Sequence, residues 1–343
     1  MGNSNVTRPL ETRLTYDDPL LASQEFSRSR TYFPLGFALN IETNSEDVLE
    51  AAAASWSFFP RAFEEGAITL SVGVSDGTER SLPKPPTFRS RKHLLSIVSD
   101  AENFLVCDFA RGYHFGWISQ AVAEELAFFR YYFLDVAVLT MIQQRFLAPI
   151  HGACVARNGR GVLLCGPSSA GKSTLAYGCS RAGWTYVSDD ATFLVRSGPD
   201  RYAIGNCYSI RFRESTKRLF PELFSLSPSL RPNGTRRIEA FTRDLPISTT
   251  SACVIDHIVF MDRNQPGPAR LERGSPERAF EWFAGFACYG EESVRNAQLE
   301  SYRKLLRAEV WELQYRELPD ALNLLDGIVP RAGLTDDEWE ERG

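Results

Sequence analysis

Apolar and polar positions alternate along the first third of the chain in the short runs that β-strands require. Residues 37–41 (FALNI), 68–72 (ITLSV) and 104–109 (FLVCDF) predict strands. Residues 45–55 predict a helix, because Asn44 and Ser45 can cap its start and Glu46 and Asp47 follow in its first turn. We therefore predict an N-terminal α+β domain over residues 19–148, preceded by a polar, flexible leader over residues 1–18.

Residues 119–146 have helical spacing, with apolar side chains three or four positions apart. These are Val122, Leu126, Phe129, Phe133, Val136 and Leu139. The spacing predicts one long helix that ends the N-terminal domain and bridges it to the rest of the chain. Arg130, Asp135 and Arg145 interrupt its apolar character, so we interpret it as a buried amphipathic helix and not as a membrane span.

After residue 149 the pattern changes to short apolar runs separated by helices, as in an α/β domain. Strands are predicted at residues 152–156, 161–165, 185–188, 192–196, 202–205, 209–213 and 253–261. Helices are predicted directly after residue 173 and at residues 216–223, 276–286 and 292–312. This domain is expected to cover residues 149–330, and an acidic, solvated tail to cover residues 331–343.

Composition narrows the class of protein. The 343 residues carry a net charge of −5, and 43% of them are hydrophobic. The acidic balance argues against a nucleic-acid partner and against a membrane surface, which both call for a basic field. Seven cysteines are scattered singly, and the first twenty residues lack an apolar core that would act as a secretory signal. We expect a cytoplasmic protein with reduced thiols.

One segment carries a specific chemical motif, GxxxxGK[ST], followed by a helix that begins near Thr174. Its residues are Gly166, Pro167, Ser168, Ser169, Ala170, Gly171, Lys172 and Ser173. The glycines permit a tight turn whose backbone amides face an anion, Lys172 reaches phosphates, and Ser173 can ligate magnesium. A simple turn that happens to hold a lysine is the alternative, but a strand before the loop and a helix after it favour phosphate binding. We predict binding of a nucleoside triphosphate with Mg²⁺.

Two further features accompany the loop. Asp189 and Asp190 follow the predicted strand 185–188, where carboxylates beside a phosphate loop can hold magnesium or take a proton from an attacking hydroxyl. The alternative is a turn between strands, in which aspartate is common. His151 stands at the start of the first strand of the second domain, and a lone histidine is more often structural than functional.

Residues 151–190 resemble the catalytic domain of the HPr kinase/phosphorylase family. A His-Gly pair opens the domain 21 residues before Lys172, and an Asp pair begins 17 residues after it. Arg181-Ala182-Gly183 also matches the family pattern. The resemblance implies an α/β P-loop kinase core of the HPr kinase/phosphoenolpyruvate carboxykinase type.

The resemblance also implies roles for single residues. Asp189 would act as general base toward a seryl hydroxyl, with His151 and Lys172 beside it. Ser173 would ligate the metal, and Asp190 would be a metal or loop partner. The implied partners are ATP and a protein or peptide acceptor, and the family allows a homo-oligomer.

The chain departs from the family in two places. The Gly-rich signature with an acidic residue that follows the Asp pair in the family is replaced here by residues 201–223, and the N-terminal domain differs from that of the true enzyme. HPr itself is therefore not the expected acceptor, and the chain is similar to the divergent HPr-kinase-like proteins. Arg211 and Arg213 share one face of the strand 209–213, where they either stabilise transferring charge or face solvent. Arg236 and Arg237 are weaker candidates.

Three functions compete on the sequence alone. The first is an ATP-dependent serine kinase, and the second is a nucleotide-binding regulator without turnover. The third is a small-molecule kinase, for which no metabolite pocket can be recognised. Replacing Asp189 by Asn separates the first two, because a kinase loses turnover and keeps ATP, whereas a regulator keeps its partner binding.

Overall fold

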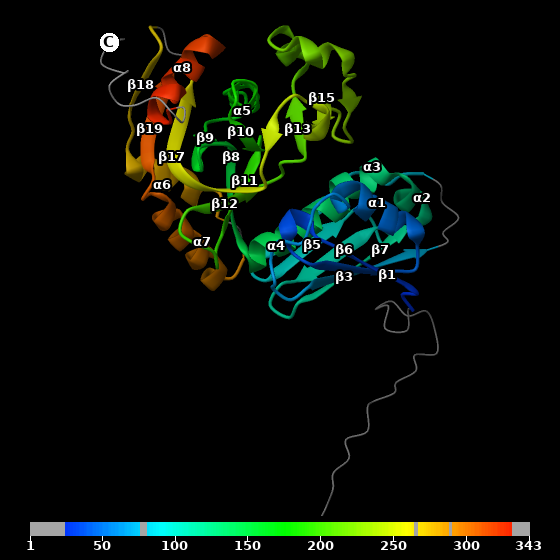
Figure 1. Cartoon of the computed structure of the whole chain (residues 1–343). Coiled ribbons are helices and arrows are strands. Elements are labelled where there is room, and N and C mark those ends of the chain that lie inside the picture. Colours follow the sequence, from blue (N-terminus) through cyan, green and yellow to red (C-terminus); the bar gives the residue numbers. More distant parts are fainter. Residues whose placement is uncertain (1–24, 76–80, 264–266, 288–289, 331–343) are drawn as a thin grey trace, which may run out of the picture.

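The computed structural model describes residues 25–75, 81–263, 267–287 and 290–330. A seven-stranded sheet, a nine-stranded sheet and a small three-stranded sheet, with helices packed against the two larger ones, make up the described chain (Figure 1). This mixed α/β architecture confirms the fold class at that level. The predicted leader over residues 1–18 and the acidic tail over residues 331–343 lie outside the described residues.

The seven-stranded sheet is built from the first third of the chain, in the order β1-β2-β3-β7-β6-β5-β4. Its strands are β1 (Arg28–Tyr32), β2 (Leu39–Thr43), β3 (Ile68–Ser75), β4 (Thr87–Arg91), β5 (Leu94–Val98), β6 (Phe104–Asp108) and β7 (Tyr113–Ser119). The short 3-10 turn η1 (Pro34–Gly36) precedes β2. Helix α1 (Glu46–Trp56) begins where the sequence predicts, since the Ser45 side chain accepts a hydrogen bond from the amide of Asp47. The three strands predicted here are confirmed.

The single long helix predicted over residues 119–146 is wrong in detail. The segment consists of α2 (Gln120–Glu124), α3 (Leu126–Phe129), the π-helical turn η2 (Arg130–Leu134) and α4 (Asp135–Arg145), and Glu125 lies outside helical geometry with ψ 73°. A π turn holds one extra residue, so the buried face shifts along the sequence. Ala137 and Val138 are buried, whereas the predicted Val136 and Leu139 are only half-buried.

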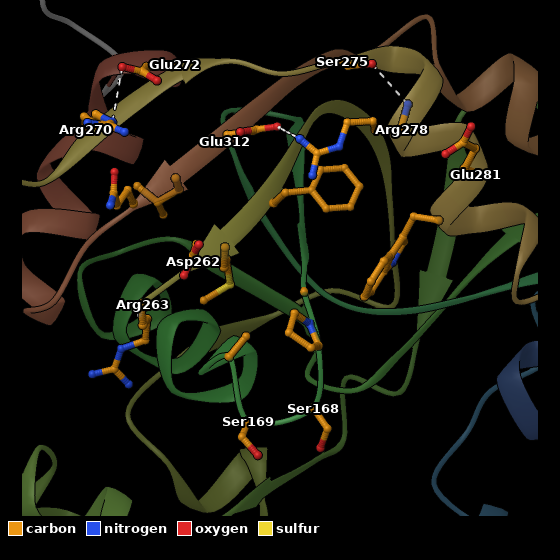
Figure 2. A pocket seen from close by; sticks show the side chains of 18 residues that line it. Ser168, Ser169, Asp262, Arg263, Arg270, Glu272, Ser275, Arg278, Glu281 and Glu312 are labelled. Atoms are coloured by element: carbon orange, nitrogen blue, oxygen red, sulfur yellow. Dashed lines mark hydrogen bonds and ion pairs between the residues drawn. The ribbon is translucent and has the colours of Figure 1, made fainter. Parts of the chain in front are cut away.

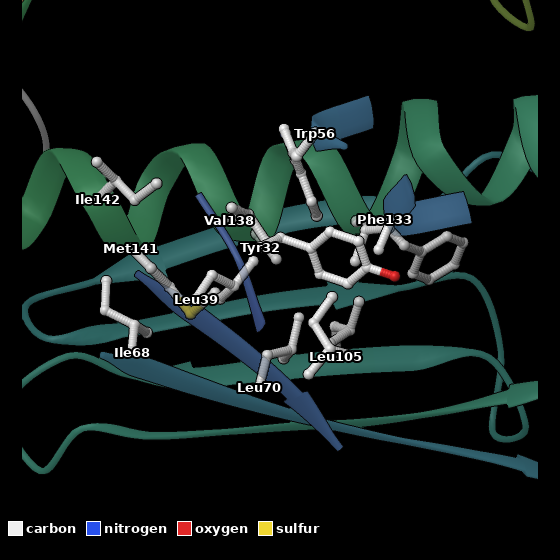
Figure 3. Packing of buried hydrophobic residues seen from close by; sticks show 14 of the residues in the cluster. Tyr32, Leu39, Trp56, Ile68, Leu70, Leu105, Phe133, Val138, Met141 and Ile142 are labelled. Atoms are coloured by element: carbon white, nitrogen blue, oxygen red, sulfur yellow. The ribbon is translucent and has the colours of Figure 1, made fainter. Parts of the chain in front are cut away.

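Residues Leu126–Arg145 are long and apolar enough to cross a membrane by length and composition. Half of that window is buried inside the protein, however. Figure 3 shows Val138 and Met141 pointing from the helix toward Leu39 of the seven-stranded sheet, and Ile142 belongs to the same buried cluster. The helix is thus part of a packed core, as its interrupted apolar pattern indicated.

The nine-stranded sheet carries the second half of the chain. Its strands are β8 (Leu147–Arg157), β9 (Arg160–Cys165), β10 (Thr185–Ser188), β11 (Ala191–Val195), β12 (Tyr202–Gly205), β16 (Ser248–Thr249), β17 (Ala252–Asp262), β18 (Arg270–Arg273) and β19 (Glu309–Gln314). Their path runs β16-β10-β8-β11-β12-β17-β19-β18, with β9 paired to both β8 and β17. Strands β9, β17 and β19 are parallel neighbours, so their carboxyl ends meet at one edge of the sheet.

Helices cover both faces of this sheet (Figure 1). On one face, α5 (Lys172–Arg181) and α8 (Leu318–Ile328) share a core with Ala153 and Val155 of β8. On the other face, α6 (Pro276–Ala284) and α7 (Glu292–Leu305) share a core with Cys154 of the same strand. Successive side chains of a strand point to opposite faces, which is why one strand serves both cores.

A three-stranded sheet, β13 (Ser209–Phe212), β14 (Ser229–Leu230) and β15 (Arg236–Phe241), stands beside the phosphate-loop region (Figure 1). The helix predicted at residues 216–223 is instead two 3-10 turns, η3 (Glu214–Arg218) and η4 (Pro221–Ser225). Pro221 lacks an amide hydrogen and cannot continue a helix that starts before it. A third short turn, η5 (Thr242–Asp244), follows β15.

The C-terminal part differs from its prediction in two respects. The helix expected over residues 292–312 ends at Leu305, and Glu309–Gln314 forms strand β19 between β17 and β18. Val310 and Leu313 of this strand are buried between neighbouring elements. The sequence pattern of this segment alone does not reveal these tertiary contacts. Helix α8 was not predicted. The helix at residues 276–286 is confirmed as α6.

The hydrophobic core beneath the seven-stranded sheet extends past the predicted domain boundary at residues 148 and 149. Beyond that boundary it includes Phe193 and Val195 of β11 and Ile204 of β12. The division of the chain at that boundary remains a prediction.

Candidate functional site

The phosphate-loop motif joins the carboxyl end of β9 to the first residue of α5. Three of its residues have positive φ angles: Gly166 at 152°, Ser169 at 77° and Gly171 at 98°. A Cβ atom on Gly171 would lie 3.3 Å from the Tyr315 hydroxyl, and one on Gly166 would lie 3.1 Å from the Cβ of Ala170. Glycine is therefore required at both positions. Such left-handed backbone turns let neighbouring amides face a common anion.

Lys172 is buried and connects the loop to His151. Its Nζ donates to the carbonyl oxygens of Gly166, at 2.9 Å, and of Pro167, at 3.2 Å, and lies 3.1 Å from His151 Nε2. The other ring nitrogen of His151, Nδ1, lies 3.2 Å from a carboxyl oxygen of Asp190. His151 therefore lies between Lys172 and Asp190, with one ring nitrogen toward each.

The two aspartates after β10 have opposite electrostatic surroundings. Asp189 accepts a hydrogen bond from the amide of Arg211 at 2.8 Å, yet burial outweighs this and raises the pKa of Asp189 to about 6. The hydrogen bond from His151 lowers the pKa of Asp190, against the opposing effect of burial. Burial lowers the pKa of Lys172. Asp189 is thus suited to take a proton near neutral pH, and Asp190 to stay ionised.

A cavity of about 560 Å³ brings most of the predicted site together. It is lined by His151, Ser168, Ser169, Gly171, Lys172, Ser173, Thr174, Asp189, Asp190, Arg211 and Arg213. Arg211 and Arg213 both line this cavity, and their role there remains a prediction. Arg213 donates to the Ser169 hydroxyl, and Arg211 pairs with Glu239 at 3.1 Å.

The sequence analysis did not single out two arginines of this cavity, Arg231 and Arg263. Arg237, a weaker candidate from the sequence, also lines it. Arg236 is not among the lining residues. Arg263 directly follows β17, and residues that follow parallel strands gather at one sheet edge, a signal that was present in the sequence. Arg231 carries no such signal, since it lies in a turn-rich loop and is placed 4.8 Å over the ring of Tyr131.

Gly166, Pro167 and Ala170 line a second cavity of about 790 Å³ on the other side of the loop, together with Ser168 and Ser169. Figure 2 shows this cavity, with the ion pair between Arg278 and Glu312 on its wall, 3.0 Å long. Phe260, Met261 and Trp282 give it an apolar part. Within the described part of the chain, the buried indole Nε1 of Trp282 has no hydrogen-bond partner.

Within the described ranges, no group of three or more His, Cys, Asp or Glu side chains could hold a metal ion. The two predicted metal ligands, Ser173 and Asp190, line the same cavity. The Ser173 hydroxyl donates to the carbonyl of Asp189 at 3.3 Å, and Asp190 contacts His151. This sparse set fits magnesium, which keeps several waters and takes phosphate oxygens as ligands.

Comparison with known proteins by sequence finds local similarity in the middle of the chain. The sequence model of the SynChlorMet cassette protein ScmC matches residues 118–207. A curated protein of Burkholderia lata named HPr kinase/phosphorylase is 42% identical over 72 residues, which cover 20% of this chain and 22% of that protein. Over these 72 residues the chain is similar to the HPr kinase/phosphorylases, and in a divergent form. It matches only about a fifth of the length of its HPr kinase/phosphorylase relative.

A solved HPr(Ser) kinase/phosphatase of Coxiella burnetii aligns with 57% of this chain and 99% of its own length. The sequence identity is 14% and the TM-score is 0.26, a value too low to support a shared overall fold. The likeness to HPr kinase/phosphorylases therefore rests on sequence.

Proposed function

We propose that this protein is an ATP- and Mg²⁺-dependent serine kinase that phosphorylates a protein or peptide. One observation carries the proposal. A single cavity joins a phosphate loop with its lysine to Asp189, whose pKa is raised to about 6, and to five arginines. Phosphoryl transfer is catalysed mainly by positioning and by neutralising charge, and this cavity supplies both.

The two cavities that meet at the loop divide the nucleotide between them. The phosphates lie in the arginine-lined cavity of about 560 Å³, which we call the phosphate cavity, within reach of Lys172. The nucleoside lies in the larger cavity, where Phe260 and Trp282 offer an aromatic surface. Ser173 and Asp190 would hold magnesium, which neutralises phosphate charge when bound.

In the transfer, Asp189 takes the proton of the acceptor hydroxyl. The seryl oxygen bonds to the γ-phosphorus as the bond between that phosphorus and the β–γ bridging oxygen breaks, so ADP leaves and a phosphoserine forms. Lys172, Arg211 and Arg213 stabilise the negative charge on the transferring group. His151 positions both Lys172 and Asp190 through its two ring nitrogens.

Two variants test the proposal. With labelled ATP, Mg²⁺ and a library of serine peptides, Asp189→Asn should keep ATP affinity and lose transfer by at least about a hundredfold, the range for a missing general base. Lys172→Ala should lose both. Intact ATP binding with no transfer to any peptide or protein would leave a nucleotide-dependent regulator in place of a kinase.

The nucleoside cavity has its own test. Trp282→Ala should weaken ATP binding about tenfold, because stacking of a base on an aromatic ring contributes about 1–3 kcal/mol. Binding of inorganic tripolyphosphate should stay unchanged, since Trp282 does not line the phosphate cavity. Equal weakening of both ligands, measured by calorimetry, would place the nucleoside elsewhere.

A further inference from the structure

A third cavity, of about 390 Å³, reaches the reactive carboxylates from the side of the seven-stranded sheet. We call it the lateral groove. One wall comes from the end of α1, the segment after it and α4, including Trp56, Phe58 and Leu139. The opposite wall comes from β13 and β15, including Glu239 and Phe241. Asp189, Asp190 and Arg211 line both the lateral groove and the phosphate cavity, so the two spaces adjoin at these side chains.

The charges of the lateral groove differ from those of the phosphate cavity. Four carboxylates, Asp135, Asp189, Asp190 and Glu239, face two guanidinium groups, Arg130 and Arg211. Both arginines have partners within the groove. Arg211 pairs with Glu239 at 3.1 Å, while Arg130 donates to Ser55, which in turn donates to Asp135, each at 2.8 Å. The groove therefore disfavours a second anion and is complementary to a neutral or basic molecule.

Aromatic side chains make up the apolar part of the groove. Phe58 meets Phe241 edge-on with ring centres 6.1 Å apart, and packs on Tyr208 at 5.3 Å. Phe241 nevertheless remains 44% exposed. An exposed aromatic at the rim of a groove that ends at a reactive carboxylate offers a place for a large apolar side chain.

We propose that the lateral groove docks the acceptor as an extended peptide, with a large apolar residue beside the acceptor serine against Phe58 and Phe241, and without acidic residues nearby. The inference rests on the proposed kinase function and identifies the acceptor side of that site. The direction of approach agrees with in-line transfer, since the acceptor hydroxyl reaches Asp189 from the groove and the phosphates reach it from the other cavity. The α1 and α4 region would then form one wall of the acceptor site.

The experiment uses the full chain and a positional library of serine peptides, in which each flanking position is fixed in turn as Phe, Leu, Ala, Lys or Asp. Transfer is followed with labelled ATP and Mg²⁺. Binding is measured separately, with a non-hydrolysable ATP analogue and the same peptides carrying Ala in place of the acceptor Ser. Phe241→Ala tests the groove. Phe224→Ala is the matched control, because Phe224 is 64% exposed and lines neither the groove nor the phosphate cavity.

A Phe or Leu next to serine should be preferred over Asp by at least about tenfold, in line with burial of one large apolar side chain. Phe241→Ala should reduce that preference to about twofold by raising KM, with ATP affinity unchanged, and Phe224→Ala should keep it. The same preference in Phe241→Ala, or none in the native chain, overturns the groove assignment. Peptides that bind through Phe241 without being phosphorylated would contradict the kinase function and leave the docking site standing.

Discussion

At the scale of single residues, the adjacent carboxylates Asp189 and Asp190 owe their different properties to their neighbours. Asp189 is the more deeply placed, and the cost of leaving water raises its pKa. Asp190 is more exposed and receives the His151 hydrogen bond, which lowers its pKa. When the pKa values of two neighbouring carboxyl groups differ in this way, one group can accept a proton while the other stays ionised.

The pKa of Asp189 predicts an acid limit for phosphoryl transfer. Below about pH 6 Asp189 is protonated in the folded chain and cannot accept the seryl proton, so kcat/KM should fall with decreasing pH. The negative charge of Asp190 raises the pKa of Asp189. Asp190→Asn should therefore move the acid limb to lower pH, whatever it does to the maximal rate. A limb that stays in place in this variant would show that another group controls the profile.

Gly171 predicts a second residue-scale result. Alanine there must adopt a φ of 98° and place its Cβ against Tyr315, so Gly171→Ala should distort the loop and weaken ATP binding at least about tenfold. Gly159→Ala is the matched control. Gly159 also has a positive φ, 78°, but no atom lies within 4 Å of its added Cβ and it is not part of the loop. Both variants should lose about 1 kcal/mol of stability, and a normal ATP affinity in Gly171→Ala would refute the strained-loop account.

At the scale of elements, helix α8 is fixed to the sheet by one buried arginine. Arg157 of β8 pairs with Asp326 of α8 and lies 4.2 Å over the ring of Trp184, whose Nε1 also donates to Asp326 at 3.2 Å. Arg157 is only 6% exposed. The group anchors α8 against the face that also carries α5, and α5 begins at Lys172 of the loop.

Asp326→Asn should therefore lower the free energy of unfolding by about 3 kcal/mol, because the charge of Arg157 stays buried without its anion. Urea denaturation followed by circular dichroism measures the change. Glu300→Gln breaks the exposed pair with Arg303 on α7 and should cost less than about 0.5 kcal/mol. Similar losses in the two variants would mean that burial does not distinguish these pairs.

The sequence pattern predicted those elements whose structure depends on adjacent residues. It failed where the structure depends on contacts with residues far away in the chain. The strand, glycines and helix of the phosphate loop could be predicted because each follows from adjacent residues. The extra residue of the π turn at Arg130–Leu134 depends on how two helical faces meet one sheet. Strand β19 exists because β17 and β18 pair with it on either side. Arg231 reaches the site through a contact with Tyr131, 100 positions earlier in the chain.

At the scale of the whole molecule, the two larger sheets are joined by shared packing. Leu147 and Ala148 of β8 pair with Val195 and Leu194 of β11. Residues of β8, β11 and β12 belong to the core under the seven-stranded sheet, namely Leu147, Phe193, Val195 and Ile204. The buried Gln298 of α7 donates to the carbonyl of Leu147 at 3.0 Å. The site lies beside this junction, since β8 also carries His151 and β11 follows the two aspartates.

From this junction we predict that dividing the chain between residues 148 and 149 lowers the stability of the loop-bearing part. A fragment of residues 149–330 would expose Phe193, Val195 and Ile204, which are at most 5% exposed in the whole chain, and would lose the β8 residues that pair with the end of β11. Exposed apolar surface of this kind lowers stability and promotes association. We expect the fragment to melt at a lower temperature than a fragment of residues 25–330, and to aggregate.

Calorimetry and light scattering on the two fragments measure this directly, and hydrogen exchange adds residue-level detail. In residues 25–330 the amides of β8 and β11 should be protected together with those of the seven-stranded sheet, because they open only with the shared core. In residues 149–330 protection should be lost first in β11 and β12. A fragment of residues 149–330 that unfolds cooperatively at the temperature of the longer one would show that the shared core contributes nothing to the stability of the loop-bearing sheet, and that the boundary suggested by the sequence separates independent domains.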